Sequence, residues 1–407
     1  MDYVNGDSLA VHAGREDLES LGVHALPIDL STTNPLPDIE RGGDSYEAMA
    51  TGGRPPEGGS NVYARLWNPT VARFESALAR LEGTEAAVAF SSGMAAMTAA
   101  ILANSMDPAA GGQRGTGPKR HIVAVRPLYG GTDHLLDSGL LGVETSFVLE
   151  HEVAGAMRDD TGMVVIESPG NPSLELVDIA GVVRQAGSVP VVVDNTFATP
   201  LLQNPVALGA SMSLHSATKY LGGHGDVIGG VIACSEERAE ALRRVRAITG
   251  ALLHPLGAYL LHRGLATLPI RMRAQQATAV RVAEWLSGHP AVERVYYPGL
   301  DGDPRGLLQT QMRGTGAMIS ITLRGGYDAA VSFTSAVRMF THAVSLGGVE
   351  SLLQHPAALT HRPVTAEAKP DLALVRLSIG LEGYEDLIAD LDRGLAATRQ
   401  PVGAATA

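Results

Sequence analysis

The residue most able to do chemistry is a lysine in a run of small residues. The stretch SLHSATKYLGGHGDVIGG, residues 213–230, places Lys219 between small side chains and a glycine-rich run. The chain has only two other lysines, at positions 119 and 369. A buried lysine amine loses its proton readily, and a neutral amine can form a Schiff base with an aldehyde. Lys219 is therefore a candidate for covalent catalysis.

An aspartate upstream of this lysine ends the apolar run VPVVVDNTFATP. The run predicts a buried strand, and open α/β sheets bind ligands at the carboxyl ends of their strands. Asp194 would lie in that crevice, although an aspartate there can also cap the next helix. Pyridoxal phosphate needs a carboxylate at its pyridine nitrogen and a lysine at its aldehyde, so Asp194 and Lys219 together make pyridoxal 5'-phosphate the expected cofactor.

A phosphate site is expected where the stretch FSSGMAAMTAAIL begins a helix. Ser92 precedes a series of good helix formers, so the free amides of Gly93 and Met94 would face an anion. Ser216 and Thr218 can add hydroxyl donors from the lysine stretch. By itself a helix start of small residues more often serves packing, so this interpretation depends on the nearby lysine and aspartate.

Apolar segments of two periods would position these residues. TVARFESALARLEG has apolar residues at helical spacing and ends at a glycine, whereas HIVAV, GMVVIES, VPVVVDNT and VIGGVIA are short β-branched runs. Strands that alternate with helices predict an α/β fold with a mostly parallel sheet, covered on both faces.

The chain divides into three parts. Its first 60 residues are rich in turn residues, notably RGGDSYEAMATGGRPPEGGSN, and predict an arm. GAYLLHRGLATLPIRMRAQQATAVRVAEWLSG predicts one long helix that could bridge two domains, and VERVYYPG, GAMISITL and LVRLSIGL predict strands of a smaller α/β domain. We expect an N-terminal arm at 1–62, a large domain at 63–255, and a C-terminal domain with the linking helix at 256–407.

The composition argues against several other functions. Cys234 is the only cysteine, which excludes an internal disulfide and a cysteine-based metal site. A net charge of −12 gives no basic footprint for nucleic acid, and the 13 histidines never take a H-E-x-x-H spacing, so no catalytic metal is expected. We find no signal peptide and no run apolar enough to span a membrane, which predicts a cytoplasmic protein.

A series of motifs in order along residues 60–385 resembles the Cys/Met-metabolism family of pyridoxal-phosphate enzymes. The motifs are YARLWNPTVARFE, SSGMAAM, PLYGGT, ESPGNP, VVVDNTFATP, HSATKYLGGH, AYLLHRGLATLPIRM, VSLGGVESL and LVRLSIGLE. The family includes cystathionine synthases and lyases, methionine γ-lyase and homoserine sulfhydrylases. The resemblance implies fold type I, the aspartate-aminotransferase-like fold, and a homotetramer made of two active dimers.

The resemblance also implies roles around the cofactor. Lys219 would be the Schiff-base lysine and the base that moves protons, and Asp194 would pair with the pyridine nitrogen. Tyr129 would stack on the cofactor ring and assist the leaving group. Residues holding the phosphate would be Gly93, Met94, Ser216 and Thr218, joined from the neighbouring subunit by Tyr63 and Arg65.

The substrate site is implied in the same way. Arg376 would grip the substrate α-carboxylate, since a guanidinium fork makes a bidentate pair. Asn171 would lie near the 3' oxygen of the cofactor and the substrate, and Ser345 would line the same site. As alternatives, Tyr129 could be an ordinary core residue and Ser345 an ordinary strand-end serine.

Three positions depart from the family pattern. Cystathionine enzymes that resemble this chain commonly carry glutamate where it has Val344, and an apolar side chain cannot pair with a distal ammonium group. Methionine γ-lyases resemble it in having valine there, but many carry cysteine where it has Gly131. Trp67 occupies a place that is often small in relatives; it would narrow the pocket from the partner subunit, or simply fill an interface.

We therefore predict a pyridoxal-phosphate-dependent γ-lyase that acts on an amino acid of the methionine or homoserine type with a small, uncharged γ-substituent. The first alternative is γ-replacement on an O-acylhomoserine, as in cystathionine γ-synthase or a sulfhydrylase. Another is elimination of an unusual leaving group such as a halide. A cofactor-bearing protein without catalysis is the alternative from a different class, and the intact catalytic residues argue against it.

Overall fold

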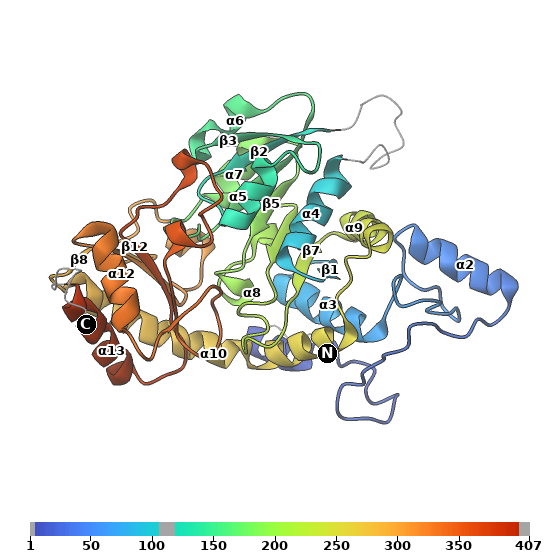
Figure 1. The fold of residues 1–407 in the computed structure, drawn as a ribbon. Helices are drawn as coiled ribbons and strands as arrows, with labels where there is room; N and C mark the ends of the chain where they lie inside the picture. The colour runs from blue at the N-terminus through green and yellow to red at the C-terminus, as the bar shows by residue number, and fades with distance from the viewer. Residues whose placement is uncertain (1–4, 106–118, 399–407) are drawn as a thin grey trace, which may run out of the picture.

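The structure is a computed structural model that describes residues 5–105 and 119–398 (Figure 1). Its larger sheet has seven strands in the order β1-β7-β6-β5-β4-β2-β3. These strands are β1 Ala86–Phe90, β2 His121–Val125, β3 Glu144–Val148, β4 Thr161–Glu167, β5 Val191–Asp194, β6 Met212–His215 and β7 Gly230–Cys234. Strand β7 is antiparallel to β1 and β6, and the other pairs are parallel, which confirms the mostly parallel sheet.

Both faces of this sheet are buried, as the β-branched runs predict. Along β2, Ile122 and Ala124 belong to one apolar core and Val123 and Val125 to another. Helices α4 Gly93–Ser105, α5 Gly130–Asp137 and α9 Glu236–Thr249 contribute to the first core, and α6 Val153–Ala156 and α7 Ile179–Ala186 to the second. Successive side chains of a strand point to opposite faces, so an uninterrupted apolar run requires cover on both.

The helix predicted from TVARFESALARLEG is α3 Pro69–Glu82. The side chain of Asn68 caps its first amides, and Pro69 takes the first helical position, where no amide hydrogen is needed. The helix ends at Gly83, whose φ of 70° lies in the left-handed region that glycine adopts without cost. Glu82 is the last residue of this helix, and its side chain contacts residues at the ends of β5 and β6.

The C-terminal part has its own five-stranded sheet, in the order β10-β11-β12-β9-β8. Its strands are β8 Val292–Tyr296, β9 Met318–Leu323, β10 Thr341–His342, β11 Leu352–Gln354 and β12 Leu374–Ser378, with helices α11 Leu307–Gln311, α12 Gly326–Ala336 and α13 Tyr384–Ala397. The long helix α10 Pro255–Ser287 runs along both sheets (Figure 1). Its residues Leu261 and Leu286 belong to one continuous core, so α10 ties the two parts together.

The N-terminal segment contains helices that the sequence analysis did not predict. The turn-rich prediction for residues 41–61 is wrong in its first half, because α2 Ile39–Ala50 forms there and projects from the body of the protein (Figure 1). The side chain of Asp38 caps this helix, and Met49 is buried against Leu66 and Ala247. Tertiary packing of Met49 therefore outweighs the weak helix propensity of the segment's glycines. A shorter helix, α1 Gly6–His12, precedes it.

Two structural features are not found in the part of the chain that the structure describes. Within residues 5–105 and 119–398, no helix is long and apolar enough to cross a membrane, and no group of three or more histidine, cysteine or acidic side chains is arranged to hold a metal ion. Cys234 is fully buried in β7, and burial raises the pKa of its thiol to about 12. The thiol therefore packs as a small apolar group, as predicted.

Candidate active site

A cavity of about 570 Å³ lies where the carboxyl ends of the large-sheet strands face the smaller sheet. Most residues predicted for the site line it: Gly93, Met94, Tyr129, Asn171, Asp194, Ser216, Thr218, Lys219, Val344, Ser345 and Arg376. These residues come from segments far apart in the chain: most follow strands of the large sheet, and Val344, Ser345 and Arg376 come from the smaller sheet and its loops. The cavity will be called the active-site cavity.

Lys219 is held at the centre of this group by the loop after β6. Its Nζ donates to Oγ of Ser345 at 2.8 Å. Burial, with a smaller contribution from the positive charge of Arg376, lowers the pKa of the Lys219 ammonium from 10.5 to about 8. The hydroxyl of Thr218 is bonded to the backbone of Gly229, which anchors the segment. The amine is therefore uncharged in a useful fraction of molecules near neutral pH.

Asp194 ends β5 and projects into the same cavity. Its Oδ1 accepts from the amide of Thr196 at 3.0 Å and from the hydroxyl of Thr196 at 2.5 Å. The same hydroxyl accepts from the amide of Ser216, so the aspartate is linked to the lysine segment. Burial raises the pKa of Asp194, and the hydrogen bonds from Thr196 oppose that rise. A buried carboxylate of this kind is suited to a cationic partner such as a pyridinium.

The two segments predicted to hold the phosphate approach each other closely. Gly93 starts α4, and a Cβ atom added there would lie 3.0 Å from Cβ of Ser216. The hydroxyl of Ser92 accepts from the amide of Ala95, and Gly93 and Met94, the first residues of the helix, line the cavity. Two helix amides and the nearby hydroxyls are the donors that a phosphate group requires.

Arg376 is fixed by three acceptors. Its guanidinium donates to Oδ1 of Asn171 at 2.9 Å, to Oε1 of Gln354 at 2.6 Å and to the carbonyl of Ser345 at 3.1 Å. The side chain is 3% exposed. Gln354 and Arg376 are register partners on β11 and β12, so the sheet itself sets their separation. A fork held this way presents its remaining donors in a constant direction.

The sequence analysis missed Glu167, which ends β4 beside the end of β5. Its Oε2 accepts from the amide of Tyr129 at 2.6 Å. Burial raises the pKa of Glu167 well above its usual range, and the negative charge of Asp194 adds to the rise. The available signal was the position of Glu167 at the end of an apolar strand, as for Asp194. Gln354, Thr196, Phe197 and Leu359 also line the cavity and were not predicted.

Tyr129 precedes α5, and its ring lies at the wall of the cavity. Burial raises the pKa of its phenol, so the group stays protonated through neutral pH. A Cβ atom added at Gly131 would come within 2.5 Å of Cε1 of the tyrosine ring. The glycine at 131 therefore leaves room for the ring position seen here, which a cysteine would disturb.

The rim of the cavity is apolar. Val344, Leu359 and Ile228 line it and are 54%, 40% and 68% exposed in the single chain. Ser345, next to Val344, has a φ of 98°, a strained conformation for a residue with a side chain. In this conformation the Ser345 hydroxyl accepts a hydrogen bond from Lys219 and the Ser345 carbonyl accepts one from Arg376.

Three predicted residues lie outside the active-site cavity of their own chain: Tyr63, Arg65 and Trp67. Tyr63 is 45% exposed, and the guanidinium of Arg65 donates to the carbonyl of Ala247 near the end of α9. Trp67 packs on the small apolar cluster of Met49. The single chain does not bring them to Lys219.

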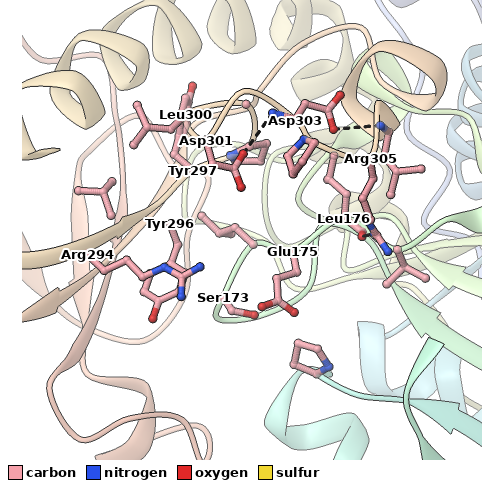
Figure 2. Close-up of a pocket in the computed structure, with 18 of the residues that line it drawn as sticks. Ser173, Glu175, Leu176, Arg294, Tyr296, Tyr297, Leu300, Asp301, Asp303 and Arg305 are labelled. Atoms are coloured by element: carbon pink, nitrogen blue, oxygen red, sulfur yellow. Dashed lines mark hydrogen bonds between the residues drawn. The ribbon is translucent and has the colours of Figure 1, made fainter. Parts of the chain in front are cut away.

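A second cavity, of about 690 Å³, lies between the loop at 173–177 and the segment at 294–307 (Figure 2). Arg305 crosses it, bonded to the carboxylate of Glu150 and to the carbonyl of Leu176. No lysine lines this cavity. Lys219, the predicted Schiff-base lysine, lines the active-site cavity instead.

The fold and the site together define a class of protein. An amine of lowered pKa, a buried carboxylate and an anion cradle at the strand ends of an α/β sheet fit the aldehyde, the pyridine nitrogen and the phosphate of pyridoxal 5'-phosphate. The protein is thus of the pyridoxal-phosphate-dependent enzyme class.

Comparisons with known proteins agree. The family described as Cys/Met metabolism PLP-dependent enzyme matches residues 7–396, and the chain belongs to this family. An L-methionine gamma-lyase of Brevibacterium sandarakinum is 58% identical, covering 98% of this chain and 99% of the relative, and one of Brevibacterium aurantiacum is 59% identical, covering 98% and 96%. The solved cystathionine gamma synthase of Xanthomonas oryzae pv. oryzae has a TM-score of 0.85 at 35% identity, covering 98% and 99% of the two chains, in accord with fold type I.

Proposed function

We propose that the protein is a γ-lyase that eliminates the γ-substituent of amino acids of the methionine type. The observation that carries the proposal is the full-length identity of 58% to a relative named L-methionine gamma-lyase. With methionine, the balanced reaction consumes one water and yields methanethiol, 2-oxobutyrate and ammonia. The residues of the active-site cavity can be assigned to the parts of this reaction.

Bound pyridoxal phosphate supplies the electron sink that makes the Cα and Cβ protons of the substrate acidic. Lys219 then serves as the base that takes the proton from Cα, because its lowered pKa leaves it partly neutral. Ser345 holds the amine in place by accepting its hydrogen bond. Tyr129, protonated at neutral pH, is placed to give a proton to the sulfur that departs from Cγ.

Substrate orientation is assigned to Arg376. A guanidinium held by Asn171, Gln354 and the backbone of Ser345 can bind the α-carboxylate in a bidentate pair. Ser345 contacts both Arg376 and Lys219, so a substrate whose carboxylate is bound by Arg376 would present its Cα to Lys219. Fixing the carboxylate in this way converts binding energy into orientation of the reacting atoms.

The choice of γ-substituent is assigned to the apolar rim. Val344, Leu359 and Ile228 offer contact to a thioether methyl group but no partner for a charged group. A distal ammonium, as in cystathionine, would lose its hydration without gaining a counter-ion. This favours methionine or homocysteine over cystathionine.

The test is an assay of the purified, cofactor-loaded protein with methionine and no added thiol. Release of 2-oxobutyrate and methanethiol in equal amounts supports the γ-lyase. O-acetylhomoserine, O-succinylhomoserine and a γ-chlorinated amino acid are assayed in parallel. Product that appears only when a thiol is supplied would instead identify γ-replacement, the reaction indicated by the name of the Xanthomonas structure.

We also propose that Tyr63, Arg65 and Trp67 serve the active-site cavity of a neighbouring subunit in a homotetramer built from two dimers. Their position outside the cavity of their own chain and the exposure of Tyr63 support this. The cytoplasmic location expected from the sequence stays a prediction.

Subunit mixing tests the shared site. Lys219→Ala and Arg65→Ala are each expected to be inactive as purified proteins. A dimer with one chain of each kind has one site with both residues intact, so unfolding and refolding the two variants together should restore part of the activity. No recovery in mixtures that do form mixed dimers would show that Arg65 acts within its own chain.

A further inference from the structure

A buried carboxylate behind the active-site cavity joins the ends of two strands. Glu82, the last residue of α3, is 2% exposed. Its Oε1 lies 2.5 Å from Nε2 of His215, and it accepts from the hydroxyl of Ser213 at 2.9 Å and from the side-chain amide of Asn195 at 3.3 Å. Ser213 and His215 belong to β6, and Asn195 directly follows β5. One carboxylate therefore holds both strand ends.

These contacts lie on the opposite face of the sheet from the cofactor site. Asp194 and Leu214 are register partners, and both line the active-site cavity. Side chains alternate between faces along a strand, so His215 points to the other face, where α3 brings Glu82. Neither His215 nor Glu82 lines the cavity. The pair can affect the cofactor only through the strand ends and its charge.

The charges around Asp194 give the pair an electrostatic role. Burial raises the pKa of Asp194, the hydrogen bonds from Thr196 lower it, and the positive charge of His215 lowers it as well. On the cavity side Asp194 interacts with Glu167 and Tyr129, and the cations Lys219 and Arg376 line the same cavity. The pair is approached from the smaller domain by Arg313, which interacts with Glu82.

The other ring nitrogen of His215 bears on why a histidine occupies this position. Among the described residues, Nδ1 of His215 is buried without a hydrogen-bond partner. A buried polar atom in this state lowers stability, and an apolar side chain of similar size would avoid that cost. Packing alone therefore does not account for a histidine at this position.

We propose that Glu82 and His215 are positioning residues that hold the ends of β5 and β6 and keep Asp194 ionised toward the pyridine nitrogen of the cofactor. The carboxylate of Glu82 bonds Nε2 of His215 and the side chains of Ser213 and Asn195, and these contacts fix the strand ends that carry Asp194. The inference rests on the role of Asp194 as the pyridine partner. It does not depend on which substrate is turned over, so the test below uses none.

The experiment compares holoproteins carrying His215→Gln, Glu82→Gln or, as a control, Asp390→Asn. The amide of Gln at 215 can still donate to Glu82 but has no charge, and Gln at 82 can still accept hydrogen bonds. Asp390 is an equally buried carboxylate, 2% exposed, that binds backbone amides in the smaller domain and does not line the cavity. We measure the pH midpoint of the visible absorption band of bound cofactor and the dissociation constant of pyridoxal phosphate.

Loss of a nearby positive charge favours the protonated form of the group whose titration changes the visible band. The pH midpoint of that band should therefore rise by roughly half a pH unit or more in His215→Gln. Glu82→Gln should move it in the same direction, because weaker contacts at the two strand ends let Asp194 pair less well with the pyridine nitrogen. Cofactor binding should weaken by about tenfold in both, and Asp390→Asn should change neither quantity. Midpoints equal to wild type in the variants that fold, or an equal shift in the control, would overturn the proposal. If one of the two variants does not fold, the other decides.

Discussion

Replacing Lys219 by methionine should stabilise the protein freed of cofactor. In the folded apoprotein the pKa of Lys219 is about 8, against 10.5 for an exposed lysine. Below pH 8 the amine is protonated in both states, so folding places a charge in a poorly hydrated site. Between pH 8 and 10.5 the unfolded chain binds more protons, and the free energy of unfolding of the wild type must rise with pH. Methionine has no titrating group, so Lys219→Met removes this dependence of the free energy of unfolding on pH.

The magnitude follows from the pKa difference. The fall from 10.5 to about 8 corresponds to about 3 kcal/mol at ~1.36 kcal/mol per pKa unit. Partial exposure of the side chain reduces this to roughly 2 kcal/mol. The lost hydrogen bond to Ser345 offsets about 1 kcal/mol. We therefore expect Lys219→Met to gain about 1 kcal/mol at pH 7, and the gain should disappear as the pH approaches 10.5.

The assay is denaturant unfolding of the apoproteins between pH 7 and 10 in buffer without phosphate. Lys369→Met is the matched control, because Lys369 is exposed, and it should leave the free energy of unfolding almost unchanged at every pH. Destabilisation by Lys219→Met at pH 7, or a difference from wild type that does not change with pH, would refute the assignment of Lys219 as a buried amine of lowered pKa.

Three further predictions concern turnover by the holoprotein. Val344→Glu should raise kcat/KM for cystathionine relative to methionine by about tenfold, because a carboxylate at the rim can pair with the distal ammonium; an unchanged ratio would remove Val344 from the γ-pocket. Tyr129→Phe should keep the visible cofactor band and lower kcat by about 100-fold, through loss of the proton donor; full activity would exclude that role. Arg376→Lys should raise KM for methionine by roughly tenfold or more, because one ammonium replaces a planar fork, and a wild-type KM would place the α-carboxylate elsewhere.

Much of the large sheet could be predicted from local pattern, and two of the three missed strands, β1 and β6, have a physical reason. The runs around β2, β4, β5 and β7 are rich in valine and isoleucine, the residues that fit a sheet buried on both faces. Strand β1, AAVAF, is mostly alanine, which has low strand propensity. Strand β6, MSLH, carries two polar residues whose burial depends on Glu82, a residue of a distant helix.

The candidate catalytic residues could likewise be proposed from the sequence, because the signal for each lies in a short segment. Lys219 stands out in a chain with few lysines, and Asp194 stands at the end of an apolar strand. Gln354 gave no such signal, since its importance comes from pairing with Arg376 across two strands. The helix α2 was missed because its stability comes from the burial of Met49 against residues far along the chain.

The sequence by itself determined the type of chemistry, because an amine, a carboxylate and a glycine-led helix start are properties of short segments: Lys219, Asp194 and Gly93. The tertiary structure decided the surroundings of those groups. It buries Lys219 enough to lower its pKa to about 8, and it sets Glu82 and His215 behind Asp194. Electrostatic environment and long-range contacts depend on which segments meet in space, and neither the spacing nor the type of a residue carries that information.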